Sequence, residues 1–102
     1  MRLSDRLFEV HPEIAFAELN GGMPVAASKK TWNGQMTRRG LLGLAGIRLP
    51  DDLAATGTVP ADDILDAAAV AWSASRIASG QASSLPSPPQ ANEAGLPIAI
   101  WY

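Results

Sequence analysis

Residues 60–80 read PADDILDAAAVAWSASRIASG, and this stretch predicts the longest helix of the chain. Proline fits the first helical turn, the acidic residues after it complement the helix dipole, and the final glycine marks the end of the helix. At 100° per residue, one arc of roughly 120° holds the apolar residues Ile64, Leu65, Ala68, Ala71 and Trp72. We expect this arc to pack against a core. A separate arc holds Asp62, Asp63 and Asp66.

The segments before this helix predict a strand and further helical structure. Residues 6–11 (RLFEVH) have the composition of a strand. Pro12 begins a short helix, and the Asn-Gly-Gly stop at residues 20–22 ends it. A second helix is expected at 33–45, weakened by its glycines and therefore dependent on tertiary packing. Residues 50–57 are expected to hold one helical turn.

The segment after the long helix predicts an extended chain. Residues 81–95 are rich in proline and serine, so we expect a connector with extended backbone. The chain closes with LPIAIWY at residues 96–102, which is typical of a short strand. The pattern as a whole predicts an α/β fold, with a few strands packed on about three helices, in one domain that spans residues 1–102.

Composition excludes several classes of protein. Of the 102 residues 47% are hydrophobic, but 18 of these are alanine, so the expected core is thin. The chain has no cysteine, which excludes thiol catalysis, disulfides and cysteine-based zinc sites. No apolar run is long enough to span a membrane, and no signal peptide is evident. We expect a cytoplasmic protein, and its pI of about 5.1 indicates no overall basic surface for nucleic acid.

Carboxylates are the groups best placed to carry chemistry. The chain has a single histidine, His11, and lacks the GxSxG, GxxxxGKS, GxGxxG and HExxH motifs. On a helix, Asp63 and Asp66, or Asp62 and Asp66, point at a common spot. Paired carboxylates of this kind suit Mg²⁺ or Mn²⁺. The alternative is that the first-turn acids only complement the helix dipole and that Asp66 lies on a solvated face.

Three motifs, in order along the chain, resemble a known family. The string ADDILDAAAVAWSA is similar to the last helix of RuvC-type nucleases with an RNase H fold. EVHPEIAFAELNGG, then SKKTWNGQ, then PADDILDAAAVAWSASRIASG resemble a bacterial family called domain of unknown function 429, and LPIAIWY fits the same pattern. The resemblance covers roughly residues 6–102. It implies a metal-dependent nuclease with an RNase H-like fold.

The resemblance also implies site residues. Asp63 and Asp66 match the last-helix carboxylates, and Glu9 or Glu13 is the candidate partner carboxylate near the end of the first strand. His11 is a candidate for orienting that carboxylate or a substrate phosphate, and Asp62 is a secondary candidate for the metal site. An RNase H fold opens with a strand that carries an essential aspartate, and this chain begins after it. We therefore expect the C-terminal portion of such a fold, with an incomplete two-metal site.

Basic residues lie close together in the middle of the chain. Lys29, Lys30, Arg38 and Arg39 fall within eleven positions, with Trp32 between the two pairs. One interpretation is a patch that contacts phosphates of a nucleic acid, with the indole as a stacking platform. The other is a solvated loop and helix face with a half-buried tryptophan.

The sequence is therefore compatible with two functions. The first is phosphodiester hydrolysis assisted by Mg²⁺ or Mn²⁺, with nucleic acid as a possible substrate and with this chain incomplete or inactive by itself. The second is a non-catalytic structural or interaction module that associates through exposed sheet edges, with a second copy of the chain as a partner.

Overall fold

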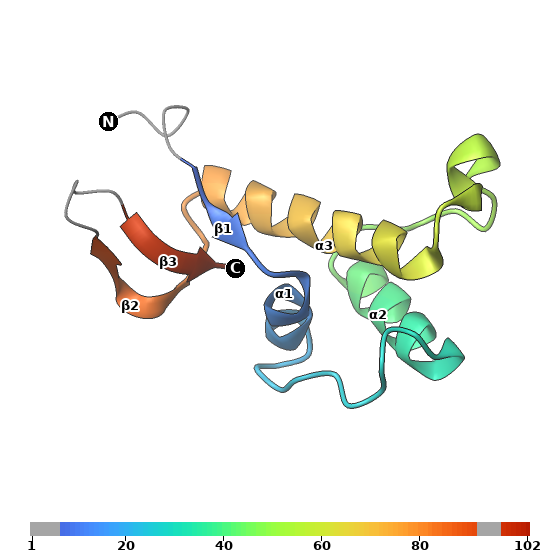
Figure 1. The fold of residues 1–102 in the computed structure, drawn as a ribbon, viewed down its shortest axis with the longest axis horizontal. Helices are drawn as coiled ribbons and strands as arrows, with labels where there is room; N and C mark the ends of the chain where they lie inside the picture. The colour runs from blue at the N-terminus through green and yellow to red at the C-terminus, as the bar shows by residue number, and fades with distance from the viewer. Residues whose placement is uncertain (1–6, 92–96) are drawn as a thin grey trace.

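A computed structural model describes residues 7–91 and 97–102 and shows a mixed α/β fold (Figure 1). The α/β prediction is confirmed. The elements, in chain order, are β1 (Glu9–Val10), α1 (Pro12–Leu19), α2 (Trp32–Leu44), the 3-10 helix η2 (Ala54–Thr58), α3 (Ala61–Ala78), β2 (Ser84–Ala91) and β3 (Pro97–Trp101). None of the helices in these described ranges is long and apolar enough to cross a membrane.

Helix α3 forms where the sequence predicts it. Its first turn contains acidic residues and Gly80, with φ of 75°, follows its end. Its buried side is rotated from the expected apolar arc: Ala71 is exposed, whereas Asp62 and Ser73 are buried. The reason is that α3 packs against α1 and α2 together, so a second face is also covered. Trp72, expected in the core, is only partly buried and lies beside the Arg76 guanidinium, which is 4.8 Å from the ring centroid.

Helix α1 supplies the centre of the core. It begins at Pro12 and is followed by Gly21 and Gly22, both with positive φ, as the sequence indicates. Phe16 is fully buried and belongs to a cluster of small and large apolar side chains from all three helices: Ala15, Phe16, Leu42, Leu65, Ala68 and Ala69. The alanines allow the helices to approach one another closely, so a packed core forms even though the chain has few large apolar side chains.

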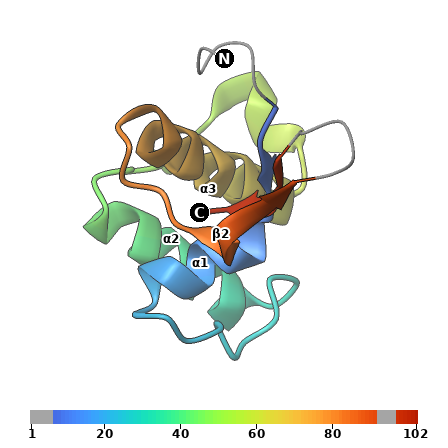
Figure 2. The same cartoon turned by 90° about the vertical axis from the view of Figure 1, so that its left-hand side faces the viewer.

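The strands form one sheet in the order β1-β3-β2. Strand β1 pairs in parallel with β3, and β2 pairs antiparallel to β3. Figures 1 and 2 show β2 and β3 together at the end of the molecule away from α2. Phe8 packs edge-on against Trp101, with ring centroids 5.4 Å apart. The sheet thus lies at one end of the helical layer.

The proline-rich segment differs from the expected connector. Its backbone is extended, but residues 84–91 form strand β2, and residues 92–96 lie outside the described residues. The pairing with β3 has an irregularity between Leu85 and Gln90. Three of the intervening residues are prolines, which lack an N–H and cannot donate to the ladder. The strand is therefore paired near its two ends, which a pattern dominated by proline does not predict.

Candidate functional site

Two carboxylates of α3 meet two ammonium groups from the α1–α2 loop. Lys30 Nζ donates to Asp62 Oδ2 over 2.7 Å, and Lys29 Nζ donates to Asp66 Oδ2 over 2.8 Å. Lys29 Nζ also lies 4.0 Å from Asp62 Oδ2. We call Lys29, Lys30, Asp62 and Asp66 the Asp–Lys cluster. It joins residues more than thirty positions apart in sequence.

The electrostatics of the cluster follow from this pairing. The hydrogen bond from Lys30 lowers the pKa of Asp62 below its ordinary value, although the burial of this side chain, which is 7% exposed, opposes the shift. The hydrogen bond and the charge of Asp66 raise the pKa of Lys29 above 10.5. Two positive charges thus balance two negative charges. Asp66 Oδ1 is nevertheless buried and has no hydrogen-bond partner among the described residues, which leaves one acceptor oxygen available beside the lysines.

The other carboxylates named from the sequence lie elsewhere. Asp63 is exposed on α3. Glu9, with its side chain 64% exposed, accepts a hydrogen bond from His11 Nε2 over 3.0 Å at the end of β1. Within residues 7–91 and 97–102, no three histidine, aspartate or glutamate side chains gather into a metal-binding group. Glu9, Asp63 and Asp66 are therefore not brought together. Helical spacing places both Asp62 and Asp63 close to Asp66. The packing of α3 brings Asp62, and not Asp63, into the same cluster as Asp66.

All four basic candidates bind protein groups, and the two arginines bind groups other than the α3 carboxylates. Arg38 is 2% exposed and makes paired hydrogen bonds to the Glu13 carboxylate. Arg39 binds Leu49 O over 2.8 Å and Asp51 Oδ1 over 2.6 Å. Of the proposed phosphate contacts, only the two lysines adjoin the α3 carboxylates.

The remaining donors of Arg38 hold the backbone. Its Nη1 donates to Ala27 O over 2.7 Å and to Gly34 O over 3.0 Å, and the guanidinium lies 5.6 Å from the centre of the Phe16 ring. Glu13 and Arg38, both candidates from sequence, thus form a partly buried ion pair that joins α1 and α2, and Arg38 also holds the loop between them.

Trp32 lies next to the cluster in sequence but is 73% exposed at the start of α2. The Trp32 side chain is therefore more exposed than the half-buried tryptophan that we expected if the basic residues form only a solvated loop and helix face. The sequence analysis did not predict that the lysines pair with the aspartates. The available signal is the opposite charge of the KK and DD-x-x-D strings.

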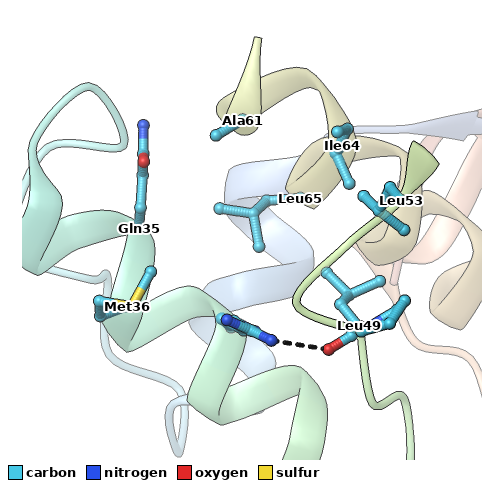
Figure 3. Close-up of a pocket in the computed structure, with 9 residues that line it drawn as sticks. Gln35, Met36, Leu49, Leu53, Ala61, Ile64 and Leu65 are labelled. Carbon is cyan, nitrogen blue, oxygen red and sulfur yellow. Dashed lines mark hydrogen bonds between the residues drawn. The ribbon is translucent and has the colours of Figure 1, made fainter. Parts of the chain in front are cut away.

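A small apolar pocket lies between α2, the segment before η2 and the start of α3 (Figure 3). It has a volume of about 140 Å³ and is lined by Gln35, Met36, Arg39, Leu49, Pro50, Leu53, Ala61, Ile64 and Leu65. The dashed line in Figure 3 ends at the carbonyl oxygen of Leu49, at one end of this pocket, and Arg39 is the donor of that hydrogen bond. At the other end Gln35 Nε2 donates to Lys29 O over 3.1 Å, so the wall of the pocket and the loop of the cluster are directly connected.

A family model matches residues 1–91, and its description is "Protein of unknown function (DUF429)". The chain belongs to the DUF429 family. The match covers most of the chain and includes the three motifs that carry the resemblance, so that prediction is confirmed. Neither a curated protein nor a solved structure matches the chain. The DUF429 description names no activity.

Proposed function

We propose that the Asp–Lys cluster binds a phosphodiester together with one divalent cation, Mg²⁺ or Mn²⁺, and that this DUF429 domain acts as a nuclease of RNase H-like type. One observation carries the proposal. Asp62 and Asp66 lie one helical turn apart, each within hydrogen-bonding distance of a lysine from another segment, and one oxygen of Asp66 is buried without a partner among the described residues.

The residues fit a single hard cation better than a pair of cations. Mg²⁺ in proteins keeps several waters and is held by one or two carboxylates plus phosphate oxygens of the substrate. Asp62 and Asp66 supply two such carboxylates. A two-metal site needs more ligands, and the described residues contain no group of three. The proposal is therefore limited to one ion with water and substrate as its other ligands.

The lysines have a distinct role in this proposal. When a cation takes the two carboxylates, Lys29 and Lys30 lose their partners, and phosphate oxygens are the natural replacement. The side chains then hold the phosphodiester beside the carboxylates, and the cation supplies Lewis-acid activation of the phosphorus centre and of a water. The lysine pair also explains how the site stays neutral without a ligand.

Metal binding tests the site. Titration of the chain with Mn²⁺ by isothermal calorimetry is expected to show binding that Asp66→Asn abolishes. Asp63→Asn is the matched control, since it removes the same charge from an exposed position of the same helix. Equal loss in both variants, or no binding in the unaltered chain, would refute the cation site.

Cleavage tests the reaction. End-labelled single- and double-stranded DNA and RNA are incubated with the chain and Mn²⁺, and products are resolved on gels. Cleavage that depends on Mn²⁺ and on Asp66, but not on Asp63, is the expected result. Absence of cleavage of all four substrates, with the metal bound, would leave a binding site and refute the nuclease assignment.

A second candidate is an interaction module that joins another copy of the chain through the sheet. Strand β1 pairs with β3 on one side, and along its other side it has no strand partner among the described residues. Exposed edges of this kind pair readily with another chain. Sedimentation equilibrium over a range of concentrations tests this: a dimer supports the module, and a monomer at every concentration contradicts it.

A further inference from the structure

The loop that carries the two lysines is held by one face of α2. Gly34 and Gln35 are adjacent on that helix and Arg38 lies one turn further on, and each contacts the backbone of residues 27–29. We call these three residues the α2 clamp. They do not touch the ammonium groups themselves.

Each contact of the α2 clamp restricts the loop in a different way. Gly34 lets the loop lie directly on the helix, because a Cβ there would sit 1.8 Å from Ser28 O and 2.5 Å from Ser28 C. Arg38 donates to Ala27 O, and Gln35 donates to Lys29 O. Three consecutive residues are thus fixed immediately before Lys30.

Arg38 is the residue on which this arrangement depends most. Its guanidinium is buried, paired with Glu13 on α1, and shared between Ala27 O and Gly34 O. A buried arginine with several acceptors is costly to remove, because backbone carbonyls that it satisfies lose their donor. Only a planar guanidinium can reach all of these acceptors at once, and lysine has a single point of charge.

We propose that Arg38 is a positioning residue that, through the α2 clamp, holds Lys29 and Lys30 opposite Asp62 and Asp66. The clamp acts on the loop backbone and not on the carboxylates. The lysines therefore keep their place when their partners are engaged by a cation, and the pair forms a preformed anion site for the phosphate of a phosphodiester. This last step rests on the proposed function, whereas the positioning role does not.

Amine acylation measures the positioning directly. Lys29 and Lys30 are the only lysines in the chain, so mass spectrometry after brief treatment with an acylating reagent reports them individually. Arg38→Met is expected to raise the acylation rate of Lys29 about two- to fivefold, the factor that corresponds to losing a partly exposed ion pair. Arg48→Met is the matched control at an exposed arginine and is expected to change nothing.

A second pair of variants separates positioning from general stability. Gln35→Ala removes one clamp contact at a partly exposed position and keeps the buried network, so a folded protein with faster Lys29 acylation is expected even where Arg38→Met does not fold. Leu42→Ala destabilises the core without removing a contact of the α2 clamp and is expected to leave acylation of the folded chain unchanged. Unchanged acylation in folded Gln35→Ala and Arg38→Met would overturn the proposal, as would an equal rise in Leu42→Ala.

Phosphate binding tests the anion site separately. Inorganic phosphate is titrated, in the presence of saturating Mn²⁺, into the unaltered chain and into Gln35→Ala. The dissociation constant for phosphate is expected to be about two- to fivefold higher in the variant, the same factor as for acylation. Equal affinity in the two would overturn the preformed anion site. If the unaltered chain binds neither Mn²⁺ nor phosphate, the proposed function fails, while the acylation result still decides whether the α2 clamp positions the lysines.

Discussion

Gly34→Ala gives the sharpest test of the loop packing. In the structure the added Cβ would lie 1.8 Å from Ser28 O, 2.5 Å from Ser28 C and 2.9 Å from Ala27 O. All three are backbone atoms, so no side-chain rotation relieves the clash. The loop must move away from α2 by more than an ångström, and the hydrogen bond from Arg38 to Ala27 O must lengthen or break.

The magnitude follows from two opposing effects. Alanine favours a helix over glycine by about 0.5–1 kcal/mol. Overpacking costs about 1–3 kcal/mol, and the loss of the partly buried hydrogen bond to Ala27 O adds about 1 kcal/mol. Gly34→Ala is therefore expected to lower the free energy of unfolding by about 1–3 kcal/mol. At Gly40, in the same helix, a Cβ meets nothing within 4 Å, so Gly40→Ala is expected to raise it by about 0.5–1 kcal/mol.

Urea unfolding followed by circular dichroism compares the two variants with the unaltered chain. The free energies of unfolding are expected to change in opposite directions, with Gly34→Ala also raising Lys29 acylation because the loop moves. If Gly34→Ala is as stable as Gly40→Ala, the close contact between loop and helix does not exist in solution, and the α2 clamp is refuted with it.

Three further outcomes are expected. Pairing lowers the pKa of Asp62, so its contribution to stability is complete above pH 3.8 and is lost as the pH falls through the lower folded pKa; acid melts of Asp62→Asn should lack this part of the decline. The pKa of Lys29 is raised, so its contribution is complete below pH 10.5 and is lost as the pH rises through the folded pKa; alkaline melts of Asp66→Asn should lack that loss, and an unchanged profile would contradict the pairing. Leu42→Ala, at a fully buried position, should cost about 2–5 kcal/mol in urea unfolding, whereas Leu44→Ala, at a position 89% exposed, should stay within about 0.5 kcal/mol; similar losses at both would contradict the orientation of α2.

Local signals made much of the fold predictable. Pro12, the glycines after residue 20 and Gly80 delimit α1 and α3 within a residue or so, because proline and glycine act on the backbone of their own neighbours. The terminal strand was likewise visible in LPIAIWY. Strand β2 was not, because its prolines cannot donate to a ladder and mask the strand pattern, even though its partner β3 follows after only five residues.

The site was predictable only in part, for the same reason. Helical spacing placed Asp66 beside both Asp62 and Asp63 and could not choose between them. The choice came from the contact of α3 with α1 and α2, which buries Asp62 and leaves Asp63 exposed. Arg38 shows the same limit: a basic residue on a helix looks like a surface charge until the position of Glu13 is known.

The sequence by itself determined where α1 and α3 begin and end, that carboxylates are the chemically promising groups, and that the chain resembles the DUF429 family. These properties depend on neighbouring residues or on ordered motifs. Tertiary structure alone decided that Lys29 and Lys30 meet Asp62 and Asp66, since ion pairs across more than thirty residues form only after the helices pack. The four charged side chains form one site because the packed helices bring them within hydrogen-bonding distance, and their spacing along the chain does not reveal this.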